Sequence, residues 1–314
     1  MTTLTSRTVA LPAKRRGSLA RRRTNFYGYL FISPWLVGFF ALFVGPSVAS
    51  LIFSFADYNV LSAARFIGFG NYVRMFTQDD LFWPSLGRTF YMTGVAVPLG
   101  VIGSMILAIL LNTQLKGVTF YRTLFFMPSL VPLLSAAVLW LWLLNADWGM
   151  VNLLLRKIGI ADPPHWFGDR RWAVPSLIMM GLWGGIGGTR MIIFLAGLQG
   201  IPDELYDAAA IDGAGTWQKT RHVTLPLLTP TIFFNLVLGI IYTLQSFEAS
   251  FVVTEGGPAY ATWFFGLHIW KHAFDYWNMG YACALAWFFA VIIVAATVVQ
   301  QRFSSRWVFY YGAE

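Results

Sequence analysis

Six long apolar stretches constrain this chain more than any other feature of its sequence. A helix that crosses a bilayer needs roughly 20 largely apolar residues, because the hydrocarbon core holds no water to satisfy free backbone groups. We predict membrane-spanning helices near Tyr29–Phe55, Ser85–Leu111, Phe120–Leu144, Ala173–Leu198, Leu227–Glu248 and Met279–Gln300. Charged residues make up 11% of the chain, against about a quarter in soluble domains. The sequence therefore predicts an all-α, polytopic membrane protein with six transmembrane helices.

A basic arm before the first span predicts which way the chain crosses the membrane. Residues 1–28 carry the basic side chains Arg7, Lys14, Arg15, Arg16, Arg21, Arg22 and Arg23. Basic segments next to a span resist translocation and remain in the cytoplasm. Because an even number of crossings returns the chain to its starting side, we expect both termini, including a tail at 303–314, to be cytoplasmic. We expect the first span and its outer loop at 29–84 and a five-helix permease core at 85–302. The first span is too long for a signal peptide and no cleavage site follows it, so we expect it to be retained.

Several kinds of chemistry are not indicated. The net charge of +8 is explained by an arm that lies beside anionic lipid headgroups, and no motif that reads nucleic acid accompanies it. Cys283 is the only cysteine, so no intrachain disulfide can form. The nearest approach to a phosphate-binding loop starts at Gly213 and has Gln218 where its second glycine belongs. We therefore expect the chain to bind neither nucleic acid nor ATP.

The polar interruption between the fourth and fifth spans predicts a cytoplasmic helical hairpin at 201–222. Pro202 suits the first turn of a helix, and Asp203 complements the positive end of that helix. The alanines that follow have the highest helix propensity, and Gly213 suits a left-handed cap. Such a hairpin could dock on another protein, although capped alanine-rich helices also occur without a partner.

The same loop resembles a known family motif. Asp207, Ala208 and Ala209 are followed by Gly213 and then by Leu225 and Pro226, a spacing similar to the EAA motif of binding-protein-dependent ABC importer permeases. The flanking residues look like the carbohydrate branch of that family, the maltose and glycerol-3-phosphate permease type. Those flanking residues are Leu195–Gln199, Ile201, Pro202, Leu205, Tyr206, Ile211–Ala214, Trp217 and Gln218. The family usually has Glu at the position of Asp207 and commonly Arg at the position of Ala210.

The resemblance implies a type I ABC importer permease fold and a permease subunit of an ATP-driven sugar importer. In that family the hairpin sits in a cleft of a cytosolic ATPase. The residues expected to couple this chain to the ATPase are Glu204, Asp207, Ala208, Ala209, Asp212, Gly213, Ala214, Leu225 and Pro226. The chain would not be an enzyme itself, because ATP and magnesium would bind to the partner ATPases. Expected partners are a second permease subunit, two ATPase subunits and an extracytoplasmic solute-binding protein, in a prokaryotic cell membrane.

Other parts of the chain look like the same family. Matching positions in the outer loops include Gly68, Asn71, Tyr72, Gly256, Gly257 and Pro258. The last three would turn the chain sharply just outside the fifth span. In the fourth span, small residues would let neighbouring helix backbones approach closely; they are Gly181, Gly184, Gly185, Gly187 and Gly188.

A path for solute is the least specific part of the prediction. Sugar sites combine aromatic platforms with a few polar groups, and the candidates are Trp183, Asn235, Tyr242, Gln245, Glu248 and Trp287. Each could instead serve helix packing or the interfacial aromatic belt. Arg190 is a further candidate, because an ionisable group at membrane depth is commonly functional. His268 and His272 are four residues apart, but no acid close to them in the sequence completes a metal site, so we expect a surface helix there and no metal.

Two other classes of membrane protein would need residues that an importer subunit does not need. A secondary, ion-coupled transporter would show repeated halves and carboxylates near the membrane midplane. A membrane-embedded enzyme would need clustered acids, histidines or a nucleophile pair at that depth. Neither pattern is visible in the sequence, and neither class explains the hairpin. The sequence is compatible with more than one sugar and with either a homodimer or a heterodimer of permease subunits.

Overall fold

The computed structural model describes residues 18–112 and 116–309, with side chains from residue 25 onward. It divides into two compact units, Met1–Ile52 and Phe53–Glu314. Most of the predicted basic arm, including Arg7 and the basic run at 14–16, lies outside the described residues. The predicted tail at 303–314 is described as far as residue 309.

The first unit contains a single long apolar helical stretch. α1 (Ser18–Gly38), the π-helical η1 (Phe39–Val44) and α2 (Gly45–Phe53) follow one another, and Asn25–Phe53 is long and apolar enough to cross a membrane. The wider π-helical turn precedes Pro46, whose ring nitrogen cannot donate a helical hydrogen bond. Side chains such as Phe31, at 83% exposure, stand out along this stretch. Lipid is the solvent that suits such a surface.

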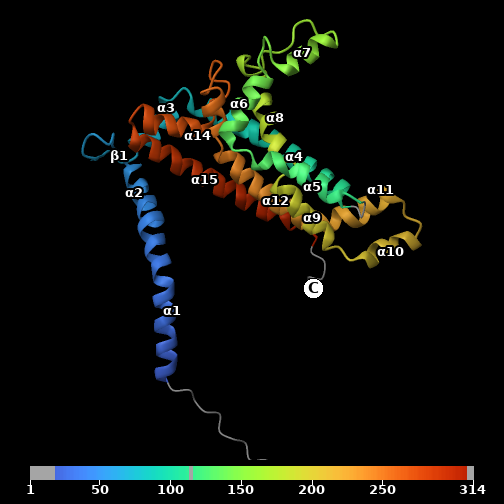
Figure 1. Cartoon of the computed structure of the whole chain (residues 1–314). Helices are drawn as coiled ribbons and strands as arrows, with labels where there is room; N and C mark the ends of the chain where they lie inside the picture. The colour runs from blue at the N-terminus through green and yellow to red at the C-terminus, as the bar shows by residue number, and fades with distance from the viewer. Residues whose placement is uncertain (1–17, 113–115, 310–314) are drawn as a thin grey trace, which may run out of the picture. The chain divides into compact units, whose positions relative to one another are not determined.

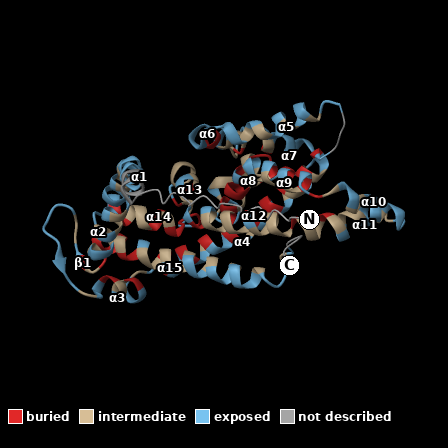
Figure 2. Ribbon diagram, turned by 90° about the horizontal axis from the view of Figure 1, so that it is seen from below, coloured by how far each residue is buried: buried red, intermediate tan, exposed pale blue. Residues whose placement is uncertain are grey.

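α4 is the central helix of the second unit. It runs over Phe82–Leu111 and packs against α8 (Ala173–Gly185), α9 (Thr189–Gln199) and α12 (Leu225–Gln245). The core between α4, α9 and α12 consists of apolar side chains, among them Val97, Val101, Met191, Phe194 and Leu228. Figure 2 shows buried residues gathered along these helices. Burial of this apolar surface stabilises the packing of the three helices.

A second packing centre lies where α15 (Met279–Ser304) meets the ends of other helices. α15 contacts α12, α3 (Gly70–Thr77) and α14 (Phe265–Trp270). Its core includes Phe82, Leu244, Phe265 and Leu285. In Figure 1 this end of the bundle, marked by α3 and α14, lies opposite the end that carries α10 (Asp203–Ile211) and α11 (Thr216–Lys219).

Two of the six predicted spans, the third and the fourth, each consist of two helices that meet at a bend. Val118–Leu130 and Leu133–Leu143 meet at 95°, and Ala173–Gly185 and Thr189–Gln199 meet at 49°. The first break precedes Pro132, because the residue before a proline is pushed into an extended conformation and Val131 has ψ 124°. The remaining predicted spans correspond to single candidate spans at Asn25–Phe53, Phe82–Leu111, Thr216–Val253 and Met279–Ser304.

The glycines of the fourth span allow the close approach that their spacing predicted. A Cβ atom at Gly187 would lie 2.0 Å from the carbonyl oxygen of Phe125, and one at Gly188 would lie 2.9 Å from Cβ of Ser129. Phe125 belongs to α5 (Val118–Phe126), and Ser129 to η2 (Met127–Leu130). Only glycine fits at these contacts, so the break between α8 and α9 can rest directly against α5 and η2.

Short elements connect the long helices. β1 (Ala56–Asp57) pairs antiparallel with β2 (Arg65–Phe66). The buried Asn71 of α3 donates hydrogen bonds from Nδ2 to the carbonyl oxygens of Ser54 and Ala56, both at 2.9 Å. The other connecting elements are α6 (Leu133–Leu143), α7 (Met150–Lys157), η3 (Trp166–Gly168), α13 (Glu248–Val253) and η5 (Lys271–Asp275).

The predicted turn at Gly256, Gly257 and Pro258 is present. Gly256 has φ +89°, and a Cβ atom there would lie 2.5 Å from the ring of Trp263. Thr262 donates from Oγ1 to the carbonyl oxygen of Gly257 at 2.7 Å. The turn therefore folds back onto the chain that follows it, which leads into α14.

Candidate functional site

The predicted hairpin between the fourth and fifth spans is present, and its first limb ends where the sequence indicated. α10 covers Asp203–Ile211 and ends before Gly213, which has φ +78°. The amide of Ala214 donates to the carbonyl oxygen of Ala209 at 2.9 Å, and the amide of Gly213 donates to that of Ala210 at 3.0 Å. This pair of hydrogen bonds is a Schellman cap, which satisfies carbonyl groups left free at a helix end.

The second limb of the hairpin is tied to the first. α11 (Thr216–Lys219) continues through the π-helical η4 (Thr220–Thr224) into α12. The Tyr206 and Thr224 hydroxyls are hydrogen-bonded at 3.0 Å. Leu205 and Tyr206 also pack against the core that α4, α9 and α12 share. The hairpin is therefore fixed to the bundle by its inner side, and a force on α10 would reach α12 through these contacts.

The outer side of the hairpin is exposed among the residues that the structure describes, as Figure 2 shows for α10. Of the predicted coupling residues, the exposed ones are Glu204, Asp207, Ala208, Asp212 and Gly213, and the half-buried ones are Ala209, Ala214, Leu225 and Pro226. Two large apolar side chains outside that prediction are also exposed, Ile211 at 87% and Trp217 at 71%. Their apolar character next to a glycine cap was the available sequence signal.

A cavity of about 220 Å³ lies between α4, α8 and α12. Its polar lining comes from Arg190, Tyr242, Thr243 and Ser246, and its apolar lining from α4 and α8. Arg190 is the second residue of α9, directly after the 49° break. The cavity thus sits at the hinge-like point where the fourth span changes direction.

The structure separates the six residues predicted along a solute path. Tyr242 lines the cavity just described, and Trp183 lines two neighbouring cavities. Asn235 is 1% exposed and donates from Nδ2 to the carbonyl oxygen of Thr231 within its own helix, so its side chain is buried in the helix packing. The remaining three, Gln245, Glu248 and Trp287, are not among the residues that line these cavities.

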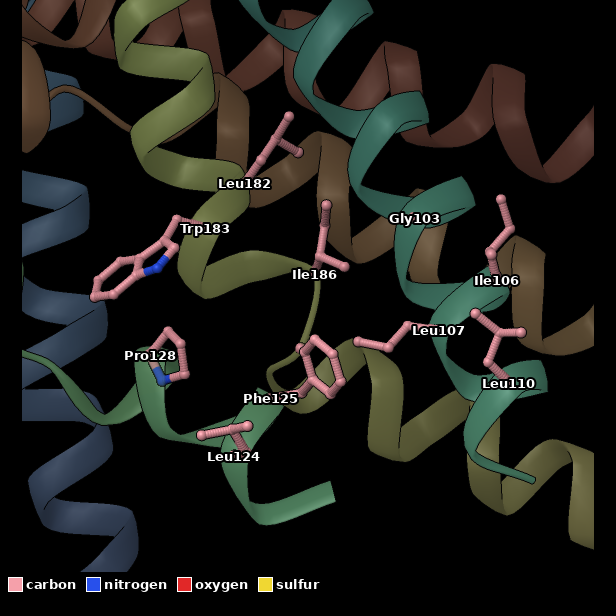
Figure 3. A pocket seen from close by; sticks show the side chains of 11 residues that line it. Gly103, Ile106, Leu107, Leu110, Leu124, Phe125, Pro128, Leu182, Trp183 and Ile186 are labelled. Atoms are coloured by element: carbon pink, nitrogen blue, oxygen red, sulfur yellow. The ribbon is translucent and has the colours of Figure 1, made fainter. Parts of the chain in front are cut away.

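A second cavity, of about 530 Å³, is almost entirely apolar. Figure 3 shows Ile106, Leu107 and Leu110 of α4 on one side of the cavity, and Phe125 of α5 and Ile186 on the other. A site for a sugar needs polar groups that hold its hydroxyls. The lining of this cavity provides little besides the indole of Trp183, so the cavity beside Arg190 is the better candidate for a solute site.

His268 and His272 are buried in a hydrogen-bonded cluster at the end of the bundle away from the hairpin. The predicted surface helix is wrong here, because His268 is 1% exposed. Asp79, which lies just before α4, accepts hydrogen bonds at Oδ2 from His268 Nε2 at 2.8 Å and from the Tyr281 hydroxyl at 2.5 Å. The cluster ties the start of α4 to α14 and α15. Asp79 was missed from the sequence because it is 189 positions away from His268.

The surroundings of the cluster shift two pKa values. Burial alone would raise the pKa of Asp79, but the hydrogen bonds from His268 and Tyr281 hold it well below its usual range. Burial lowers the pKa of His272 to about 4, and the neighbouring His268 acts in the same direction. Asp79 is therefore a carboxylate and His272 a neutral imidazole at neutral pH.

Asp79, His268 and His272 place potential metal-ligand atoms within 4.8 Å of one another. The indole nitrogen of Trp263 donates to Nδ1 of His268 at 3.0 Å, which assigns the proton of that ring to Nε2. A ring nitrogen that carries a proton cannot coordinate a metal. The hydrogen bonds thus favour a structural cluster over a metal centre.

Comparison with known proteins identifies the family. Residues 82–308, which contain both the cavity and the hairpin, match the binding-protein-dependent transport system inner membrane component family. The chain belongs to this family. It is 39% identical over 296 residues to the probable ABC transporter permease protein YesP of Bacillus subtilis, covering 93% of this chain and 95% of that protein. It is 32% identical to the lactose transport system permease protein LacF of Rhizobium radiobacter, covering 93% and 97% of the two chains.

The fold is shared with a solved importer. A chain of a bacterial ABC transporter involved in the import of alginate superposes with a TM-score of 0.82 at 24% identity, covering 92% of this chain and 98% of that one. The predicted all-α permease fold is confirmed. The chain is a multi-pass membrane permease of an ABC importer, a class of membrane component that works with partner subunits.

Proposed function

We propose that this permease forms one half of the translocation pathway of an ATP-driven carbohydrate importer. Its partners would be a second, different permease subunit, two cytosolic ATPase subunits that bind ATP and magnesium, and an extracytoplasmic solute-binding protein. The similarity to a lactose permease over nearly the whole chain supports a sugar substrate. With the hairpin facing the ATPases, both termini lie in the cytoplasm of a prokaryotic cell, and catalysis of ATP hydrolysis lies on the partners.

The observation that carries the proposal is the construction of the hairpin. Its inner side is fixed to the bundle through Leu205 and Tyr206, and its outer side presents Asp207, Ile211 and Trp217. An apolar pair with an acidic neighbour is suited to a groove on another protein, because burial of Ile211 and Trp217 favours association. The ATPases would move the hairpin, and η4 and α12 would pass that movement on to the cavity beside Arg190. A solute that contacts the inward and outward states differently would then be moved between them.

The test uses the full complex in membrane vesicles. Asp207→Lys reverses an exposed charge on the hairpin, and Asp162→Lys reverses an exposed charge in the connection between α7 and α8. At equal abundance in the membrane, we expect Asp207→Lys to lose both the co-purifying ATPase and the uptake of a labelled sugar panel, while Asp162→Lys keeps both. Uptake and ATPase association that survive Asp207→Lys unchanged would contradict the docking role.

A secondary transporter is the rival for the same geometry. Such a transporter needs a carboxylate near the midplane to hold its coupling ion. Arg190 is the charged residue that lines the cavity between α4, α8 and α12, and no Asp or Glu is among the lining residues described. This lining favours an importer driven by ATP.

A further inference from the structure

The guanidinium of Arg190 lies against two glycines on neighbouring helices, which leave room for it. A Cβ atom at Gly100 of α4 would lie 2.3 Å from Nη1 of Arg190, and one at Gly239 of α12 would lie 3.2 Å from Nη2. The guanidinium therefore fits between the backbones of α4 and α12, at the edge of the 220 Å³ cavity. Its position is set by the packing of three helices and not by a free rotation of its side chain.

No acid neutralises this guanidinium within the described part of the chain. Arg190 takes part in none of the ion pairs or side-chain hydrogen bonds found among residues 25–112 and 116–309. A charged side chain at membrane depth is costly, and such residues are usually paired or mark the path of a substrate. Arg190 is fixed in position, has no acidic partner among the described residues and borders a cavity. It is therefore suited to bind an anion.

A second unpaired cation, Arg88, lies on α4, the helix that carries Gly100. Arg88 is three helical steps of four residues before Gly100, so the two sites are about 18 Å apart along α4. Nη1 of Arg88 is buried without a hydrogen-bond partner in the described chain, and Arg170 lies within electrostatic range of it. The residues between them on this side of α4, Met92 and Ala96, line the cavity. Positive charge thus stands at both ends of the cavity-lining stretch of α4.

We propose that the cavity between α4, α8 and α12 binds the acid group of an anionic carbohydrate, such as a uronic acid or a sugar phosphate or sulfate. The planar guanidinium of Arg190 can bind two oxygens of a carboxylate, phosphate or sulfate at once. Tyr242, Thr243 and Ser246 supply an aromatic face and hydroxyls for the sugar ring on the α12 side. This inference rests on the proposed function and gives its substrate a chemical class.

The test measures ligand binding to the purified complex without its solute-binding protein, so that the selectivity of that protein does not enter. The probes are digalacturonate and its methyl ester, and glucose 6-phosphate and glucose, which differ in each pair by the acid group. We expect the acidic member of a pair to raise the thermal stability of the complex in nanodiscs. Arg190→Met should raise the half-saturating concentration of the acidic probe by about 10- to 100-fold. Lys157 is an exposed cation on α7, and Lys157→Met should leave that concentration unchanged.

Glycine variants keep the proposal testable if removal of Arg190 impairs folding. Gly100→Ala displaces the guanidinium without removing its charge, whereas a Cβ atom at Gly94 of the same helix meets nothing within 4 Å. We expect Gly100→Ala to weaken binding of the acidic probes and Gly94→Ala to leave it unchanged. Binding that is insensitive to Gly100→Ala and Arg190→Met would overturn the proposal.

Two other outcomes separate the competing explanations. Equal stabilisation by the acidic and neutral members of each pair, or stabilisation by the neutral members alone, would overturn the anionic class and leave the proposed importer function intact. The same binding assay in phosphatidylcholine and in phosphatidylglycerol nanodiscs distinguishes a sugar acid from a lipid headgroup. If phosphatidylglycerol abolishes acidic-probe binding in the wild type, the site belongs to lipid and the proposal fails. If the wild-type complex took up no sugar in the presence of ATP, that result would instead refute the proposed function.

Discussion

Replacing Gly213 tests the hairpin at the point where its geometry depends on one residue. Gly213 has φ +78°, and a Cβ atom there would meet nothing within 4 Å. Gly213→Ser therefore introduces no clash, and its cost comes from the left-handed backbone alone. That cost is about 1 to 2 kcal/mol for a residue with a Cβ atom, which lowers the ratio of capped to uncapped hairpin about 5- to 30-fold. Gly215→Ser is the matched control, because Gly215 has φ −71° and ψ 171° and is the N-cap of α11, where serine is favoured.

Hydrogen exchange measures the effect directly. The amides of Gly213 and Ala214 donate the two hydrogen bonds of the cap, so their exchange reports its opening. We expect Gly213→Ser to speed exchange at Ala214 about 5- to 30-fold and to weaken ATPase association, and Gly215→Ser to do neither. Identical exchange in the two variants would refute the reasoning that a glycine cap holds the hairpin in its docking shape.

Three further predictions concern other parts of the chain. Asn71→Ala leaves the buried carbonyl oxygens of Ser54 and Ala56 without their donor, so we expect a loss of about 1 to 3 kcal/mol in stability, measured as a lower thermal midpoint in detergent. Gly187→Ala forces a Cβ atom to 2.0 Å from a backbone oxygen and should reduce folded protein in the membrane, whereas Gly181→Ala, which meets nothing within 4 Å, should not. The pKa of His272 is lowered from 6.5 to about 4, so the unfolded chain takes up that proton first and stability is lost as pH falls from 6.5 towards 4. His272→Gln should reduce the dependence of the thermal midpoint on pH over that range. Asp79, His268, Tyr281 and Arg74 surround the position in the variant as well. An unchanged slope of the midpoint against pH would contradict the assignment.

The sequence predicted the elements that depend on local signals. Apolar length indicated the six spans, and the proline, alanine and glycine positions of 201–222 indicated the hairpin as far as the cap at Gly213. The bends within the third and fourth spans were missed, although Pro132 and the glycines near Gly187 carried the signal. Apolar length alone cannot distinguish a straight helix from a broken one.

The candidate solute site depended on contacts that span the chain. Asn235 and Tyr242 lie seven residues apart on α12 and were both candidates for the solute path, yet Asn235 is buried while Tyr242 is 69% exposed. The seat of Arg190 is made by Gly100 and Gly239, and Asp79 meets His268 from the other half of the chain. Such pairings come from the order in which helices pack, which a single sequence does not display.

The source of the energy tests the account most directly. Vesicles that carry the full complex can be supplied either with ATP or with a proton or sodium gradient, and uptake of a labelled carbohydrate panel can be followed under each condition. We predict uptake with ATP alone, and its loss when ATP is replaced by a non-hydrolysable analogue or when Asp207→Lys is introduced. Uptake that follows the ion gradient in the absence of ATP, and that survives both changes, would contradict the account and favour a secondary transporter.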